Sequence, residues 1–146
     1  GKPTYSSEVR SLASKRIQAI AKEIPFVVTG GDIPGILQKV EWKVGRIEMF
    51  VREIGVLQQE YDTIIEDTEE SSTSLAIDFS YHFQKAKLRM NFLVGDEYPF
   101  SPMNVSFTTL IGSIDVDSLG KEIIKNVKPG YGYLTRVCEF VKNFMK

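Results

Sequence analysis

The sequence contains very few of the residues on which metal and nucleophilic sites depend. Among its 146 residues there is one cysteine and one histidine. A single cysteine excludes an intramolecular disulfide and a CxxC metal pair, and a single histidine excludes the usual multi-histidine metal sites. We therefore expect no metal site. The glycines form neither a GxGxxG unit between a strand and a helix nor a phosphate-binding loop, so we expect no cofactor either.

Long apolar runs and an excess of one charge are also missing. No apolar run approaches the ~20 residues of a transmembrane helix, and no signal-peptide pattern opens the chain. The 18 basic and 19 acidic residues nearly cancel, which argues against nucleic acid and acidic membranes as partners. Because 42% of the residues are hydrophobic and 25% charged, we expect a packed globular core. No feature indicates a small-molecule substrate, so the expected partners are proteins.

Two helices are predicted in the N-terminal part. Residues 6–24 place their apolar side chains on one helical face, and Pro25 should end this helix because the residue before a proline resists helical geometry. Asp32 is a candidate N-cap for a longer helix over about 33–57. The apolar face of the first helix consists of Val9, Leu12, Ala13, Ile17, Ile20 and Ile24. That of the second consists of Leu37, Val40, Val44, Ile47, Val51 and Ile54.

After Tyr61 the apolar period changes from that of a helix to that of strands. Short strands are expected at 61–66 and 105–110, and strict alternation predicts a hairpin of strands over 75–83 and 87–94. Residues 67–73 form the expected acidic turn, and helices should follow at about 115–126 and 133–145. This order predicts an α+β fold, in which helices pack on one face of a four-stranded antiparallel meander.

Three groups of residues could carry chemistry, and each also has a structural explanation. His82 is either a general base or an exposed strand histidine, and we favour the latter. Cys138 lies on the apolar face of the last helix, which favours a core position over a reactive thiol. The acidic residues Glu66, Asp67, Glu69 and Glu70 lack the spacing of a calcium loop, which favours a solvated hairpin tip. Trp42 lies beside the main helical stripe, where it either fills a flank of the core or awaits a partner.

One short motif is more informative. Tyr98, Pro99, Phe100 and Pro102 form an aromatic–proline corner before the fourth predicted strand, where the prolines hold the chain extended and remove two backbone donors. This corner resembles the Tyr-Pro-Phe-x-Pro turn of ubiquitin-conjugating enzymes and of the related RWD domains. The resemblance covers about residues 33–145 and implies an RWD-like fold. Residues 108–119, where an active enzyme of this family has His-Pro-Asn and then its cysteine, contain no His, Pro or Cys. We therefore expect no enzyme.

Further matches resemble the C-terminal RWD region of the KNL-family outer-kinetochore scaffold, a part of the KMN network. They are the Arg-Glu-Ile-Gly-x-Leu run at 52–57, Tyr61, the Lys-Leu-Arg-Met-Asn-Phe-Leu run at 87–93 with the following Glu-Tyr-Pro, and the Gly-Tyr-Leu-Thr-Arg-Val run at 132–137. Residues 32–146 would then be the RWD-like domain. Residues 1–31 would be an extra helix and loop, the last helix of a preceding RWD domain. The resemblance implies a nuclear protein of kinetochores and centromeres, which docks on the MIND/Mis complex during chromosome segregation.

Alternatives to this function remain open. The chain could be a catalytically dead ubiquitin-conjugating variant, or an RWD module of another regulatory protein. The expected partner-binding residues are Val9, Leu12, Ile17 and Ile20, if the neighbour of this stripe is missing, together with Trp42. The double substitution Ile17→Asp and Ile20→Asp should then weaken docking without unfolding the sheet. The polar sheet face with Asp78, Lys87 and Arg89 is a second candidate surface.

Overall fold

The structure, a computed structural model, describes residues 5–28, 33–69, 71–81, 83 and 85–145. Within them it has an α+β fold of four helices and one four-stranded sheet. The elements follow the order α1 (Ser7–Val28), α2 (Ile33–Glu60), β1 (Asp62–Thr68), β2 (Ser72–Tyr81), β3 (Ala86–Gly95), β4 (Asn104–Ile111), α3 (Val116–Asn126) and α4 (Tyr133–Phe144).

The sheet is an antiparallel meander in the order β1-β2-β3-β4. Side chains alternate between its two faces. On the covered face, Ile77 of β2 pairs with Met90 of β3, and both are buried. On the other face, Asp78 pairs with Arg89. The predicted alternation is thus confirmed, with two corrections. Ala76 and Asp78 were expected on the wet face, yet they are buried too. Phe83 was expected on the buried face, yet β2 ends at Tyr81 and the side chain of Phe83 is 91% exposed beyond it.

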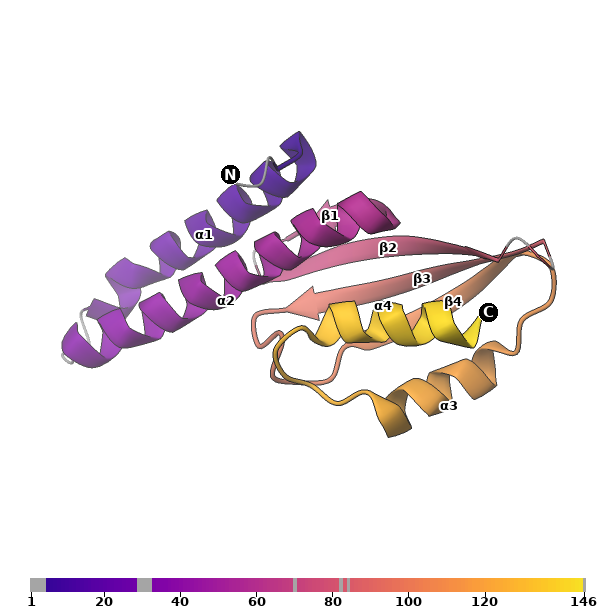
Figure 1. Ribbon diagram of the computed structural model, residues 1–146. Helices are drawn as coiled ribbons and strands as arrows, with labels where there is room; N and C mark the ends of the chain where they lie inside the picture. Colours follow the sequence, from indigo (N-terminus) through magenta and orange to yellow (C-terminus); the bar gives the residue numbers. More distant parts are fainter. Residues whose placement is uncertain (1–4, 29–32, 70, 82, 84, 146) are drawn as a thin grey trace.

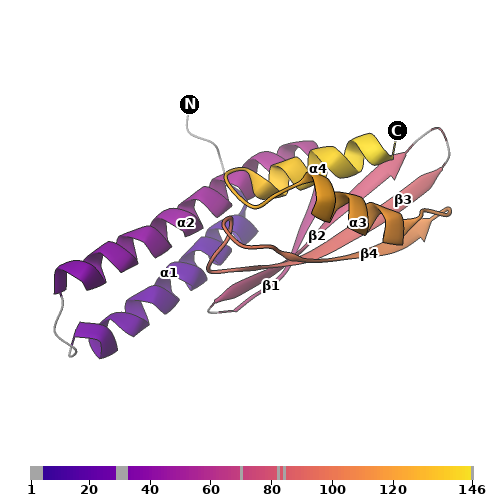
Figure 2. The same ribbon diagram turned by 90° about the horizontal axis from the view of Figure 1, so that it is seen from below.

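The helices lie on one side of the sheet (Figures 1 and 2). Their apolar faces and the covered sheet face form one hydrophobic core, to which α1, α2, β2, β3, α3 and α4 all contribute. The pair of α1 and α2 extends past the end of the sheet (Figure 1). The first turns of α2 therefore have fewer neighbours, and Leu37, predicted to be buried, is exposed.

Several predicted boundaries are wrong by a few residues. Helix α1 does not stop at Pro25 but ends at Val28. Proline removes only one intrahelical hydrogen bond, and in the last turn of a helix little structure depends on that bond. The acidic turn is also shorter than expected, since β1 reaches Thr68 and β2 begins at Ser72. Asp32, Glu70 and His82 lie outside the described residues, so the expectations for them stay predictions.

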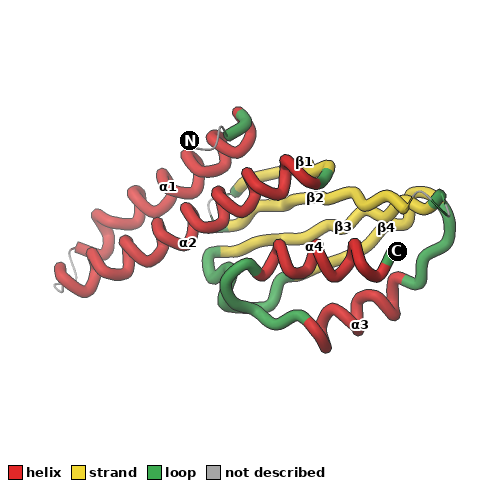
Figure 3. The backbone as a smooth tube through the Cα atoms, in the orientation of Figure 1, coloured by secondary structure: helices red, strands yellow, loops and turns green. Residues whose placement is uncertain are grey.

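Two loops meet at one end of the molecule (Figure 3). One follows β3 and contains the aromatic–proline corner, and the other joins α3 to α4. The amide of Gly130 donates a hydrogen bond of 2.7 Å to the carbonyl oxygen of Pro99 and ties the loops together. The fold therefore places the motif of the sequence analysis next to the start of α4.

Candidate functional site

The only cysteine is in no position to act as a nucleophile. Cys138 is buried in the core on α4. Burial, together with the carboxylates of Glu53, Glu60 and Glu139, raises the pKa of this thiol far above its ordinary value. A thiol without solvent access and with so little thiolate has no nucleophilic role at neutral pH.

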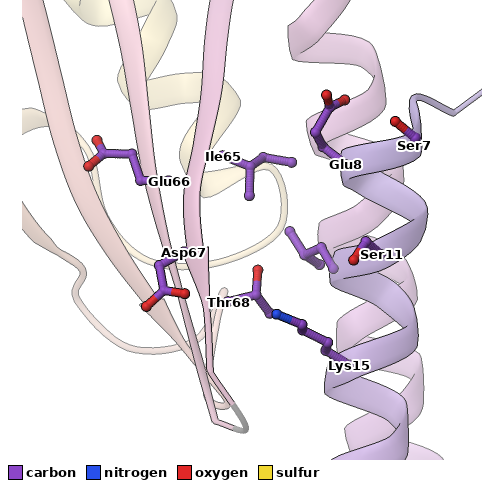
Figure 4. A pocket seen from close by; sticks show the side chains of 9 residues that line it. Ser7, Glu8, Ser11, Lys15, Ile65, Glu66, Asp67 and Thr68 are labelled. Carbon is purple, nitrogen blue, oxygen red and sulfur yellow. The ribbon is translucent and has the colours of Figure 1, made fainter.

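A cleft between α1 and β1 is bordered by Glu66 and Asp67, two of the acidic residues considered as cation ligands. Figure 4 shows Ile65 pointing across it toward α1, and Lys15 of α1 pointing toward Thr68. The side chains of Glu66 and Asp67 point to the opposite side of β1 (Figure 4). In the described part of the chain, no group of three or more His, Cys, Asp or Glu residues converges as metal ligands would.

The aromatic–proline corner stabilises the start of α4. Tyr98 is buried, follows β3 and precedes a cis peptide bond to Pro99. Its hydroxyl donates to the carboxylate of Glu53 on α2 and accepts a hydrogen bond of 2.9 Å from the amide of Leu134. The same carboxylate accepts from the amide of Thr135 at 3.1 Å and from its hydroxyl at 2.7 Å.

This network replaces a missing helix cap. The N-cap of α4 is Gly132, which has no side chain to accept a hydrogen bond. Tyr98 and Glu53 supply the acceptors from other elements, and the negative charge of Glu53 suits the positive end of the helix. Burial and the neighbouring carboxylate of Glu53 raise the pKa of Tyr98 well above its ordinary value, so the hydroxyl stays protonated and can donate. Sequence reasoning missed Glu53; a helix that begins at a glycine is the signal that could have pointed to it.

The outer side of the corner is apolar and exposed. Phe100 is 53% exposed and packs edge-to-face on Tyr131, which is 74% exposed. Arg136 lies 6.0 Å from the ring centroid of Tyr133 and donates hydrogen bonds to the carbonyl oxygens of Lys128 and Tyr131. The loop before α4 is therefore fixed from several directions while its aromatic side chains face solvent.

An apolar groove of about 390 Å³ continues from this corner between β4 and α3. Met103, Val105 and Phe107 line one wall, and Ile123 and Ile124 line the other. Pro102, Gly120, Val127, Lys128, Pro129 and Tyr133 complete it. Ile124 stands at the groove with 74% of its side chain exposed. Ile124 therefore extends the apolar surface of the groove into solvent.

Most of the α1 residues that were expected to bind a partner do not lie on the surface. Val9, Leu12 and Ile20 are buried in the core, so the expectation of an exposed stripe is wrong for them. The reason is that α2 and the sheet cover that face of α1, so it has no missing neighbour within this chain. Of the remaining two, Ile17 is 37% exposed and Trp42 is 60% exposed. Trp42 thus does not fill the core.

A buried arginine fixes α1 to the sheet, which sequence reasoning also missed. Arg16 is 2% exposed and forms a salt bridge of 2.7 Å with Asp96, after β3. It also donates to the hydroxyl of Thr73 at 3.2 Å and to the carbonyl oxygen of Val94 at 3.4 Å. Arg46 of α2 donates to the carbonyl oxygen of Asp96 at 2.9 Å, so both helices are bound at the same point.

The charged residues of the open sheet face pair with one another. Arg89 contacts both carboxylate oxygens of Asp78, at 2.8 and 3.0 Å, and Lys87 lies 3.8 Å from the same carboxylate. Hydrogen bonding to Arg89 lowers the pKa of Asp78 below its ordinary value. Because these charges already pair with one another, fewer of them are available to bind a partner protein than the sequence indicated.

Comparison with known proteins adds no family assignment. No protein-family model matches the chain, and no curated protein matches it at a significant level. In the described part of the chain, none of the helices has the length and apolar character needed to cross a bilayer.

Proposed function

We propose that this chain is a non-catalytic protein-interaction domain of the RWD type, which docks a KNL-family kinetochore scaffold onto the MIND/Mis complex. The observation that carries the interaction role is the apolar groove between β4 and α3, with Ile124 exposed on it and the exposed pair of Phe100 and Tyr131 on the loops at its end. Apolar side chains gathered on a fixed surface are typical of protein-binding sites.

The order of the elements supports the RWD-type assignment. A long helix, a four-stranded meander, an aromatic–proline corner and two C-terminal helices follow one another. The corner contributes to structure through the Tyr98 hydroxyl, and the only thiol is buried. Both properties favour a binding module over a conjugating enzyme, which needs an accessible thiolate. The kinetochore as the place of action rests on the sequence resemblance alone.

Reconstitution tests this proposal. The purified chain, mixed with the purified MIND/Mis complex, should co-elute in size-exclusion chromatography and give a saturable isotherm in calorimetry. No binding at micromolar concentrations would refute docking on that complex. In parallel, incubation with ubiquitin-activating enzyme, ATP and ubiquitin should yield no adduct sensitive to reducing agents. Such an adduct would instead favour the conjugating-enzyme alternative.

A further inference from the structure

We infer that the groove between β4 and α3 binds an extended, acidic peptide, which adds to the sheet as a strand beside β4. This inference deepens the proposed interaction function and rests on it. Strand addition lets backbone hydrogen bonds supply affinity while side-chain pockets supply specificity. It requires an accessible strand edge, an adjacent apolar groove and charges that match the peptide.

The two edges of the sheet differ sharply in their protection. Proteins shield edge strands with charged residues, prolines and bulges, because an unpaired edge invites another strand. Strand β1 has acidic residues at Asp62, Glu66 and Asp67, and its register shifts between Ile65 and Asp67. Strand β4 has the sequence NVSFTTLI, with no charged residue and no proline, and its register against β3 shifts only near its end, between the pairs Leu88–Thr109 and Lys87–Ile111.

The outer edge of β4 is also open. Strand β4 pairs with β3 alone. No backbone hydrogen bond runs from its outer edge to any residue that the structure describes. Helix α3 lies over the face of β4 rather than along its edge (Figure 2), and the groove runs between them. An added strand could therefore hydrogen-bond to β4 and turn every second side chain into the groove.

The charges around the groove select an acidic occupant. Lys128 lines the groove, and Lys121 lies three residues before Ile124 on a neighbouring position of the helix surface. Arg136 lies at the same end, where it contacts the loop of Lys128 and Tyr131 through carbonyl oxygens only. None of these three cations forms a salt bridge with a carboxylate in the described ranges. A peptide with apolar residues at alternate positions and acidic residues toward the corner fits this arrangement.

Selection from a phage-displayed library of random peptides tests the inference without knowledge of the natural partner. We expect the selected peptides to combine alternating apolar residues with acidic ones, and hydrogen exchange to show new protection of β4 amides when they bind. Selection of basic or helical peptides would overturn the inference. So would protection on β1 in place of β4.

Variants with matched controls locate the site. Ile124→Glu should weaken the selected peptides by about tenfold or more, since it removes most of the contact of one apolar side chain. Val56→Glu makes the same change at another exposed helix position and should leave affinity unchanged. Lys121→Glu should also weaken binding, whereas Lys39→Glu, on the first turns of α2, should not. Equal effects within either pair would overturn the assignment.

Two further results separate this inference from the proposed function. If the MIND/Mis complex binds the Ile124→Glu and Lys121→Glu variants as tightly as the wild type, the groove is wrong but the function stands. If the complex binds neither the wild type nor the variants, while the selected peptides still protect the β4 amides, the proposed function is wrong and the assignment of the groove as a peptide site is kept. A dimer of the free chain with protected β4 amides, seen by sedimentation, would show a second copy as the occupant and overturn the acidic-peptide inference.

Discussion

The hydroxyl of Tyr98 should be a large single contributor to stability, although it is one oxygen atom. Tyr98→Phe removes the donor to Glu53 and leaves the buried amide of Leu134 without its acceptor. A hydrogen bond to a charged group contributes about 1.5–3 kcal/mol, and an unsatisfied buried amide costs ~1–3 kcal/mol. The two losses share one hydroxyl group and therefore do not simply add, and phenylalanine costs less than tyrosine to bury, which offsets part of the loss. We expect the free energy of unfolding to fall by about 2–3 kcal/mol.

Tyr133 provides the matched control. Its ring stacks on that of Tyr98 at 6.3 Å, but its hydroxyl makes no hydrogen bond to the described residues. Tyr133→Phe should therefore change the free energy of unfolding by ~0.5 kcal/mol or less. Urea unfolding followed by circular dichroism measures both variants, with an unchanged slope as the sign that stability alone has changed.

Amide hydrogen exchange measures the effect of the substitution locally, at the start of α4. In the Tyr98→Phe variant, the amides of Leu134 and Thr135 at the start of α4 should exchange faster, while those of β3 change little in comparison. A difference of less than about 0.5 kcal/mol between the two tyrosine variants would show that the Tyr98 hydroxyl does not stabilise the start of α4.

Three other predictions concern residues away from this corner. The pKa of Asp78 is lowered below 3.8 by Arg89, so the pair stabilises the fold above that pH and this contribution is lost as the pH falls through the lower folded-state value. Arg89→Leu should consequently raise the midpoint pH of acid unfolding, and an unmoved midpoint would contradict the pairing. The thiol of Cys138 should react with Ellman's reagent only after unfolding, because it is buried and its pKa is raised; stoichiometric reaction of the native protein would disprove this. Ile20→Asp should cost ~3 kcal/mol or more, whereas Ile17→Asp should cost ~1 kcal/mol or less, since only Ile20 is buried. Thermal unfolding measures the difference, and equal melting temperatures would place α1 outside the core.

The fold class and the elements could be predicted because their signals are local. The two-residue alternation over Leu75–Phe79 and Leu88–Val94 fixes both the strands and the face that is buried. The start of α3 also has a local signal, because the side chain of Asp115 accepts a hydrogen bond from the amide of Ser118 as an ordinary N-cap. Each of these features depends on residues only a few positions apart.

The polar contacts could not be predicted because their partners are distant in the sequence. Arg16 and Asp96 are 80 positions apart, and Glu53 and Thr135 are 82 apart. Arg16 lies on the same helical face as Val9, Leu12 and Ile20, but this spacing does not say which carboxylate it meets. Only the packing of α1 against the sheet buries it and selects a carboxylate as its partner.

The misplaced partner surface on α1 has a related cause. An amphipathic helix has an apolar stripe whether that stripe faces its own chain or another one, so the stripe alone does not identify its neighbour. In this structure, α2 and the sheet cover Val9, Leu12 and Ile20. On α3, Ile124 is exposed although its neighbour Ile123 is buried, and the apolar pattern alone does not say which of the two faces the core.

Stability and binding should be linked through the corner. The lining of the groove includes Pro102 and Pro129, in the two loops joined by the bond from Gly130 to Pro99, and Tyr133 at the start of α4. The cap on α4 formed by Tyr98 and Glu53 fixes the second of these loops at its helical end. A groove whose walls are held before binding loses less conformational freedom when a peptide enters. If a peptide binds the groove as inferred, Tyr98 should contribute to its affinity without touching it. Loosening the start of α4 would raise the cost of ordering the groove even where every lining residue is unchanged.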